Sequence, residues 1–220
     1  MNIGIIFDLD GTLLDTLTDL ADAVNETLRH YGCPEHSYRQ IRAMVGNGVR
    51  NLILAALPEE KKDRVDEILP WFRAYYAAHS QDKTCPYPGI LDALTEICRD
   101  FPAAVVSNKP DAMVKPLCRQ FFGDLYALGE VADLPRKPAP DMVYRAMEAL
   151  GVEKCVYVGD SEVDIQTAAN SGVPCLSVLW GFRDREVLEK AGANCFCRTP
   201  DRLPDCIRQI AAGMSLKTRS

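Results

Sequence analysis

Short apolar segments recur along this 220-residue chain, and they restrict the possible folds more than any other feature. They span residues 3–7, 103–106, 155–158 and 174–179, with weaker segments at 194–197 and 124–128. Strands that are apolar on both faces are buried on both faces, as in a parallel sheet covered by helices. Helical patterns alternate with them at residues 109–121, 138–150, 162–171 and 184–191. This alternation predicts an α/β fold built on a doubly wound parallel sheet.

The stretch from residue 15 to residue 84 interrupts this alternation, because it contains helical patterns only. Glycines and prolines divide it into patterns at residues 16–31, 37–44, 48–57 and 61–79. The sequence from Thr16 to Asp19 has the form of a capping box at the first helix start. We therefore expect an α/β core made of residues 1–14 and 85–220, with residues 15–84 as an all-helical insert.

The composition argues against several classes of function. Lys and Arg number 25 against 31 Asp and Glu, which gives a formal net charge of −6. Apart from a short basic tail at residues 217–219, no basic run indicates nucleic-acid binding. No apolar stretch is long enough to span a bilayer, and the N-terminus does not have the form of a signal peptide. We expect no nucleic-acid partner and no membrane partner.

The nine cysteines bear on the cellular compartment. They form no Cys-x-x-Cys pair, and Cys155 and Cys175 lie inside apolar segments, where cysteine acts as a small hydrophobic residue. Reduced thiols explain this usage better than zinc ligands or disulfides. We therefore expect a cytoplasmic protein.

Two acids directly follow the first apolar segment. Asp8 and Asp10 are two residues apart, so their side chains lean to one side while the backbone stays extended. Ligands of open α/β sheets bind beyond the carboxyl ends of the strands. Adjacent carboxylates repel unless a cation holds them, and Mg²⁺ is a natural candidate. One carboxylate could then attack phosphorus while the other serves the leaving oxygen. From these two acids alone, a polar loop after a buried strand is an equally good interpretation.

Four polar motifs stand along the chain, three of them directly after a predicted strand. They are Asp8-x-Asp10-Gly11-Thr12, Ser107-Asn108-Lys109, Arg136-Lys137-Pro138-Ala139-Pro140 and Gly159-Asp160-Ser161-Glu162-Val163-Asp164. In this order they resemble the four motifs of the haloacid dehalogenase superfamily, and the resemblance covers essentially the whole chain. It implies a Rossmann-like core, and the helical insert stands where that family carries a cap of the first type.

The resemblance implies a role for each motif. Asp8 would be the nucleophile that becomes phosphorylated, Asp10 the acid and base, and Lys137 the cation that contacts both nucleophile and phosphate. The residues placed around the phosphoryl group are Gly11, Thr12, Ser107 and Asn108. The residues placed around Mg²⁺ are Asp8, Asp10 through its backbone carbonyl, Asp160 and Asp164.

Taken singly, several of these residues have plainer interpretations. Ser107 and Asn108 precede a Lys-Pro pair, as residues that cap a helix do. Ser161 and Asp164 also fit a capping box at a helix start. Whether Asp164 binds the metal directly or orients its surroundings stays open. A single lysine is more often a solvated surface residue, and the Lys-Pro-x-Pro context favours the catalytic role of Lys137.

The insert would select the substrate, because in relatives it closes over the core. Its turn Gly46-Asn47-Gly48 resembles the phosphoglycolate phosphatases, as does the stretch at residues 179–183. Backbone N–H groups of this turn could approach the substrate, and Arg50 could meet a substrate carboxylate. A plain connection between helices explains the glycines equally well. The resemblance therefore implies hydrolysis of a small phosphorylated metabolite, with 2-phosphoglycolate first.

Other functions stay open at this point. Within the superfamily, the chain could hydrolyse another small ester (a sugar phosphate, a nucleotide or pyrophosphate) or act as a phosphoglucomutase. Outside it, a signalling domain phosphorylated on aspartate uses similar residues, but such domains are much shorter and lack an insert after the first strand. An inactive binding module is disfavoured, because all the expected motif residues are present.

Overall fold

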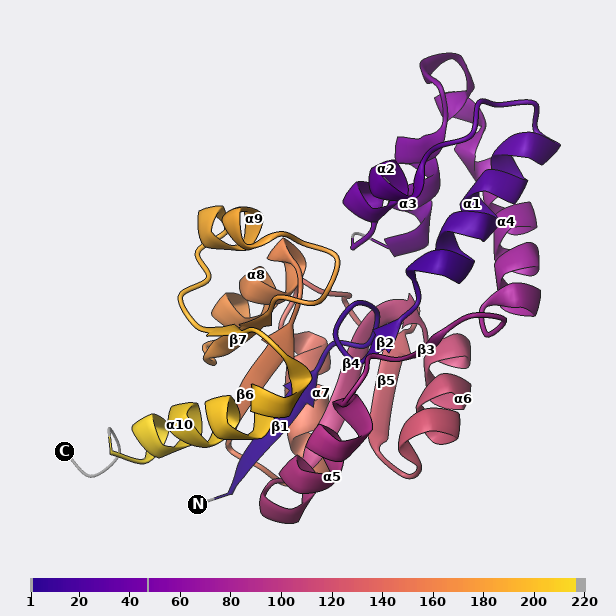
Figure 1. The fold of residues 1–220 in the computed structure, drawn as a ribbon. Coiled ribbons are helices and arrows are strands. Elements are labelled where there is room, and N and C mark those ends of the chain that lie inside the picture. Colours follow the sequence, from indigo (N-terminus) through magenta and orange to yellow (C-terminus); the bar gives the residue numbers. More distant parts are fainter. Residues whose placement is uncertain (1, 47, 217–220) are drawn as a thin grey trace. The chain divides into compact units, whose positions relative to one another are not determined.

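The protein is described by a computed structural model that covers residues 2–46 and 48–216 (Figure 1). The chain forms two compact units. The larger unit has two segments, one up to Leu14 and one from Pro86 onward. The smaller unit runs from Asp15 to Cys85. Each unit has buried apolar side chains of its own.

The larger unit is built on a six-stranded parallel sheet in the order β5-β4-β1-β6-β7-β8. The strands are β1 (Ile3–Phe7), β4 (Ala103–Pro110), β5 (Tyr126–Glu130), β6 (Lys154–Gly159), β7 (Cys175–Val178) and β8 (Phe196–Cys197). The chain proceeds outward from β1 through β4 to β5, then returns to β6 on the other side of β1. This order confirms the predicted doubly wound fold, and its switch point lies between β1 and β6.

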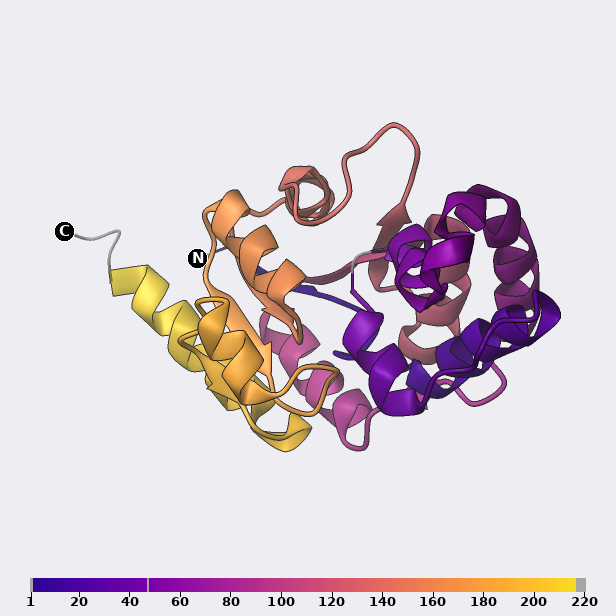
Figure 2. The same ribbon diagram turned by 90° about the horizontal axis from the view of Figure 1, so that it is seen from above.

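Helices cover both faces of this sheet, as Figure 2 shows. Those on one face are α5 (Ile90–Asp100), α6 (Asp111–Phe122) and α10 (Leu203–Leu216). Those on the other face are α7 (Asp141–Leu150) and α8 (Glu162–Ser171). A short helix α9 (Arg185–Lys190) and the 3₁₀ turn η2 (Pro200–Arg202) follow β7 and β8. All five residues of β1 are buried between these layers, which explains why the segment is apolar throughout.

Prolines displace two helix starts from their predicted positions. The helix expected from residue 109 begins at Asp111, and β4 continues through Lys109 to Pro110. The helix expected from residue 138 begins at Asp141, after Pro140. Residues before proline avoid helical dihedrals. The backbone therefore stays extended up to Pro110 in β4, whereas before α7 it forms a turn in which Ala139 N donates to Arg136 O at 3.0 Å. Because the residue that caps α6 is Pro110, the interpretation of Ser107 and Asn108 as helix caps is wrong.

The smaller unit contains helices joined by turns. They are α1 (Leu17–His30), α2 (Tyr38–Met44), α3 (Gly48–Ala56), the 3₁₀ helix η1 (Glu59–Arg64) and α4 (Val65–His79). Phe72 and Tyr76 of α4 are buried in this unit. Trp71 and Tyr75 of α4 stack on each other with ring centroids 5.4 Å apart.

The predicted capping box at Thr16 is wrong. The Thr16 side chain makes no capping hydrogen bond, and the Leu17 N–H instead donates to Asp15 Oδ1 at 3.3 Å. The Asp19 carboxylate accepts from the backbone N–H groups of Lys83 at 3.0 Å and Thr84 at 2.8 Å. Two short strands, β2 (Leu14–Asp15) and β3 (Cys85–Pro86), pair where the chain enters and leaves this unit.

Across the described ranges, none of the helices has the length and apolar character needed to cross a membrane.

Candidate functional site

Three buried carboxylates meet at the switch point of the sheet. Asp8 directly follows β1 and its N–H donates to Val158 O of β6 at 2.8 Å. Asp160 directly follows β6, and Asp164 lies in the first turn of α8. One carboxylate oxygen from each of the three lies within 4.8 Å of the others. The parallel strands thus bring two of the sequence motifs together at one edge of the sheet.

Lys137 joins this cluster from the loop between β5 and α7. Its Nζ donates to Asp8 Oδ1 at 2.7 Å, to Asp164 Oδ1 at 2.8 Å and to the Tyr157 hydroxyl at 3.0 Å. The lysine is 4% exposed, so these bonds lie in a region from which water is largely excluded. An ammonium group has three N–H donors, and the three groups satisfy all of them.

Asp164 organises the start of α8. Its Oδ2 accepts from Ser161 N at 3.1 Å, Ser161 Oγ at 2.6 Å and Asp160 N at 3.2 Å, and the predicted capping box is confirmed. Its Oδ1 accepts from Lys137 and from the Tyr157 hydroxyl at 3.2 Å. Both oxygens therefore already accept hydrogen bonds, which favours an orienting role for Asp164 over direct metal binding.

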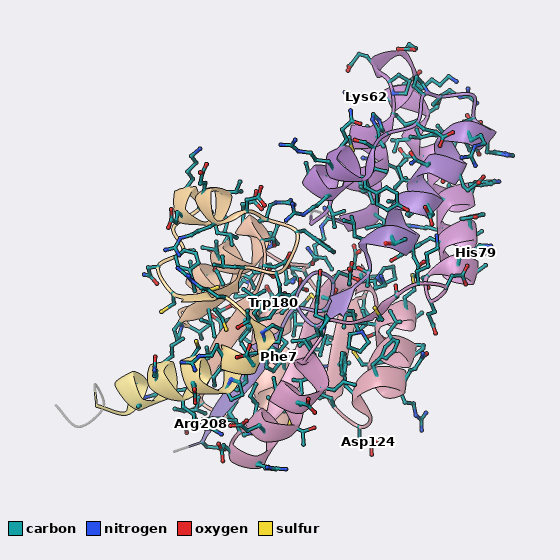
Figure 3. The ribbon with its side chains drawn as sticks, in the orientation of Figure 1. Phe7, Lys62, His79, Asp124, Trp180 and Arg208 are labelled. Carbon is teal, nitrogen blue, oxygen red and sulfur yellow. The ribbon has the colours of Figure 1, made fainter. Side chains whose placement is uncertain are left out.

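Asp160 is held by the loops that follow β1 and β7, the two strands on either side of β6. Thr12 Oγ1 donates to Asp160 Oδ1 at 3.2 Å, and Phe182 N donates to Oδ2 at 2.6 Å. Trp180, which is labelled in Figure 3, connects the same loops, because its Nε1 donates to Thr12 O at 3.0 Å. The stretch at residues 179–183 therefore has a structural role in the site: it supports a buried carboxylate.

The site carries an excess of buried negative charge. Burial raises the pKa of Asp8 well above its ordinary value, opposed by Lys137 and reinforced by Asp164 and Asp160. Burial and the charge of Asp164 raise the pKa of Asp160 to about 7. Burial lowers the pKa of Lys137, but Asp164 and Asp8 outweigh it and hold that pKa well above the ordinary value.

One ammonium group does not balance three carboxylates in a desolvated site. An additional cation would offset this excess, and carboxylate oxygens are the ligands that hard divalent cations prefer. The residues present therefore fit a divalent metal ion, and the cluster of Asp8, Asp160 and Asp164 could bind one.

The second motif lies at the end of β4, next to β1. Ser107 and Asn108 are buried, and Asn108 Nδ2 donates to the backbone carbonyl of Lys137 at 2.9 Å. This bond fixes the loop that carries Lys137. Within the described residues, Asn108 Oδ1 is buried without a hydrogen-bond partner.

Asp10 lies apart from the three-carboxylate cluster. Its Oδ1 accepts from Lys109 Nζ at 3.1 Å, and its side chain is 19% exposed. Gly11 follows with φ of +85°, a conformation that glycine adopts without strain. At this turn the Asp10 side chain lies next to the ammonium group of Lys109, a residue of β4.

The residues expected to select the substrate belong to the smaller unit. Gly46 follows α2 and Gly48 is the first residue of α3, while Asn47 is outside the described residues. Their approach to the site stays a prediction. Arg50 donates from Nε and Nη2 to the two oxygens of Asp66, both at 2.9 Å. This bidentate pair weakens the expectation that Arg50 meets a substrate carboxylate.

Two residues of the site were not predicted to have a role. Tyr157 lies inside β6 and is buried. A buried tyrosine hydroxyl needs a hydrogen-bond partner, and this requirement could have pointed to a polar group near β6. Lys109 belongs to the second motif, for which the resemblance implies roles only at Ser107 and Asn108. Its involvement depends on β4 continuing past Asn108, which the helical pattern did not indicate.

Comparison with known proteins gives a consistent result. Residues 5–178 match the model of the family described as haloacid dehalogenase-like hydrolase. The phosphoglycolate phosphatase of Chromobacterium violaceum is 32% identical over 196 residues, covering 84% of this chain and 88% of the relative. That of Aquifex aeolicus is 34% identical over 187 residues, covering 81% and 85%.

Solved structures agree with these sequence relatives. One, of a protein assigned to the phosphoglycolate phosphatases in Lactobacillus delbrueckii subsp. bulgaricus, has a TM-score of 0.88 and 37% identity. It covers 94% of this chain, and this chain covers 99% of it. A haloacid dehalogenase-like family protein from Streptococcus pneumoniae, 22% identical with a TM-score of 0.83, shares the fold.

Proposed function

The chain belongs to the haloacid dehalogenase-like hydrolase family, and on that premise we propose that it is a Mg²⁺-dependent phosphatase that forms an aspartyl phosphate on Asp8. The family match confirms the resemblance drawn from the four motifs and, with it, the predicted hydrolase class. The relatives named above are phosphatases, which are phosphoric monoester hydrolases. The substrate class follows from them: a small phosphorylated metabolite.

The observation that carries this proposal is the contact between Lys137 and Asp8. A carboxylate that attacks a phosphate ester brings two like charges together, and the repulsion raises the barrier. An ammonium group 2.7 Å from the attacking side chain and 3% exposed offsets that repulsion where water does not screen it. Such a cation is in place before the reaction and does not need to reorganise.

The first step transfers the phosphoryl group to the protein. An Asp8 oxygen forms a bond to phosphorus while the bond from phosphorus to the ester oxygen breaks. Asp10 gives its proton to that oxygen, which leaves as the alcohol. Thr12 lies on the turn after β1, whereas Ser107 and Asn108 lie near the end of β4. We place all three around the phosphoryl oxygens.

The second step returns Asp8 to its original state. Asp10, now a carboxylate, accepts a proton from a water molecule that attacks phosphorus. The bond between phosphorus and Asp8 breaks and inorganic phosphate is released. Ester and water are thus converted into alcohol and phosphate, with both aspartates restored.

A divalent metal ion would complete the charge balance of the site. Asp8, Asp160 and the backbone carbonyl of Asp10 would hold Mg²⁺, and Asp164 would orient the residues around it. When bound, the ion supplies positive charge that stabilises the phosphoryl oxygens as their charge develops.

We propose 2-phosphoglycolate as the physiological substrate. The support comes from the relatives, which carry that name at 32% and 34% identity over most of their length. The turn at Gly46-Asn47-Gly48 would contribute backbone N–H groups to the substrate, and the smaller unit would act as the cap. We place the protein in the cytoplasm, because all nine cysteines are free thiols, as is typical of a reducing compartment.

The decisive experiment measures phosphate release from 2-phosphoglycolate with Mg²⁺, with a chelator, and with Asp8→Asn. We expect rapid release by the wild type, loss with chelator, and loss in the variant with its circular dichroism spectrum unchanged. Asp124→Asn, an exposed substitution of the same kind, is the control and should keep full activity.

Three results would revise the proposal. Residual activity of Asp8→Asn at a tenth of the wild-type rate would contradict the nucleophile assignment. Slow release from 2-phosphoglycolate combined with fast release from a sugar phosphate, a nucleotide or pyrophosphate would keep the mechanism and replace the substrate. Transfer between the hydroxyls of a glucose phosphate, rather than release, would indicate a phosphoglucomutase.

A further inference from the structure

A second buried lysine lies in the site, and the proposed chemistry does not use it. Lys109 is 6% exposed as a residue and its side chain is 4% exposed. Its Nζ lies 3.1 Å from Asp10 Oδ1, on the carboxylate that exchanges protons with the leaving group and with water. The site therefore has one lysine on the nucleophile and another on the acid and base.

The backbone that carries Lys109 is held from two sides. Its N–H donates to Ser107 Oγ at 3.2 Å. Its carbonyl oxygen packs so closely on β5 that a Cβ at Gly129 would come within 2.6 Å of it. Because β4 also pairs with β1, the strand that leads into Asp10, the stem of Lys109 has a fixed position relative to the acid.

Asp10 is less enclosed than Lys109. Its side chain is 19% exposed, and it lies on the turn after β1 rather than within the strand. A proton must pass over hydrogen-bond distance to the ester oxygen, so a carboxyl group that changes rotamer loses rate. A charge-assisted hydrogen bond from a buried stem restricts that rotation.

We propose that Lys109 is a positioning residue for Asp10, which keeps the carboxyl group aimed at the leaving oxygen. The inference rests on the proposed function, since it concerns the proton transfer of the phosphatase reaction. Lys109 acts through Asp10, and its contribution is therefore largest where protonation of the leaving group matters most.

That dependence gives a test that a general structural defect would not pass. An alkyl phosphate such as ethyl phosphate releases a strongly basic alkoxide unless the oxygen is protonated. 4-Nitrophenyl phosphate releases an anion that is stable in water and needs little protonation. We compare kcat/KM for the two esters, because this ratio reports the steps up to the first irreversible one and leaves out hydrolysis of the aspartyl phosphate.

Lys109→Met should lower kcat/KM for ethyl phosphate by about 10²-fold and leave the value for 4-nitrophenyl phosphate within a few fold. Lys109→Gln is the second variant, in case methionine prevents folding. Lys115→Met, which removes an exposed lysine of α6, is the matched control and should change neither value. In an Asp10→Asn background, adding Lys109→Met should produce no further loss, because the group being positioned is gone.

An equal loss with both esters in Lys109→Met and Lys109→Gln would overturn the inference, as would no loss with either ester. A further loss in the Asp10→Asn background would overturn it too. If the wild type hydrolyses neither ester and releases no phosphate from 2-phosphoglycolate, the proposed function itself fails. If the wild type is active but its leaving-group dependence is the same with and without Lys109, only the inference fails.

Discussion

Asp160 lies so close to Gly11 that no side chain can occupy position 11. A Cβ built on Gly11 would come within 2.4 Å of Asp160 Oδ2 and 2.8 Å of its Cγ. The same carboxylate accepts hydrogen bonds from Thr12 and Phe182. The glycine of the first motif is thus required by the aspartate of the fourth, 149 residues later.

Gly11→Ala should therefore displace Asp160. We expect phosphatase activity to be lost and the free energy of unfolding to fall by about 1–3 kcal/mol, because the residue also has positive φ. Urea unfolding and isothermal titration with Mg²⁺ measure the two effects. Gly172→Ala is the matched control: φ is +69° there, but the Cβ would meet open space. It should cost stability and leave metal affinity unchanged; a similar loss of metal affinity would contradict the explanation.

Tyr157→Phe removes a single oxygen atom and should weaken catalysis. The hydroxyl accepts from Lys137 Nζ and donates to Asp164 Oδ1, so its loss leaves the ammonium one acceptor short. We expect kcat to fall by about 10-fold, as for other residues that orient site groups, and KM to change little. Steady-state kinetics provide the split between kcat and KM. Tyr144→Phe, at an exposed tyrosine of α7, should be neutral, and an unaffected kcat in Tyr157→Phe would show that Lys137 does not depend on the hydroxyl.

Stability without metal should fall as pH rises from about 4 to about 7. The pKa of Asp160 is raised from 3.8 to about 7, and that of Asp8 is raised in the same direction. In this range the folded protein binds more protons than the unfolded chain, so unfolding becomes easier as protons are removed. Below the unfolded pKa both states are protonated, and this contribution no longer changes with pH. The raised pKa of Lys137 has an effect of the same sign at higher pH: its stabilising contribution persists through this range and is lost only as pH rises above the ordinary lysine value.

Mg²⁺ should reverse this trend, because it binds the ionised carboxylates and releases their protons. Urea midpoints from pH 5 to pH 8, with a chelator and with Mg²⁺, measure both effects. The stabilisation by Mg²⁺ should be larger at pH 8 than at pH 6. Asp160→Asn should flatten the metal-free curve, and an equally steep curve in that variant would assign the pH dependence to other groups.

Thiol reactivity should divide the cysteines by burial. Burial raises the pKa of four of them to about 12, namely Cys118, Cys155, Cys175 and Cys197. The thiolate is the nucleophile, so these four should resist iodoacetamide at pH 8, whereas the exposed Cys85 should react. Peptide mass spectrometry after a short exposure measures this, with the urea-unfolded protein as the control in which all nine react. Early labelling of Cys155, inside β6, would contradict the packing of the sheet.

The sequence predicts the sheet well where burial alone determines the pattern. The bounds of β1 agree with the structure, because every residue of that strand is apolar and buried. The helix α8 also has its predicted bounds, since Ser161 and Asp164 cap it locally. Two helices were not predicted: α5 starts after Gly89 without a side-chain cap, and α10 has Pro204 in its first turn. Local start signals were weak or ambiguous in both.

The site was predicted as a set of motifs but not as a network. Asp8, Lys137 and Asp160 were identified because each follows or flanks a recognisable pattern. That Lys137 also contacts Tyr157 and Asp164 depends on how the loop after β5 returns to β6, over separations of 20 and 27 residues. Local propensity carries no information at that range. The pair of Asp10 and Lys109 was missed for the same reason, at a separation of 99 residues.

Asp19 has a consequence for how such a protein can change over time. By accepting hydrogen bonds from Lys83 and Thr84, it closes the helical unit on itself, and β2 and β3 pair where the chain enters and leaves. The spacing between the two ends of the insert is then set by the paired strands β2 and β3, whatever the number of helices between them. We expect duplication, shortening or exchange of those helices to leave the register of β1 intact. On the proposed function, such a junction would let one catalytic scaffold acquire new specificities by modular replacement.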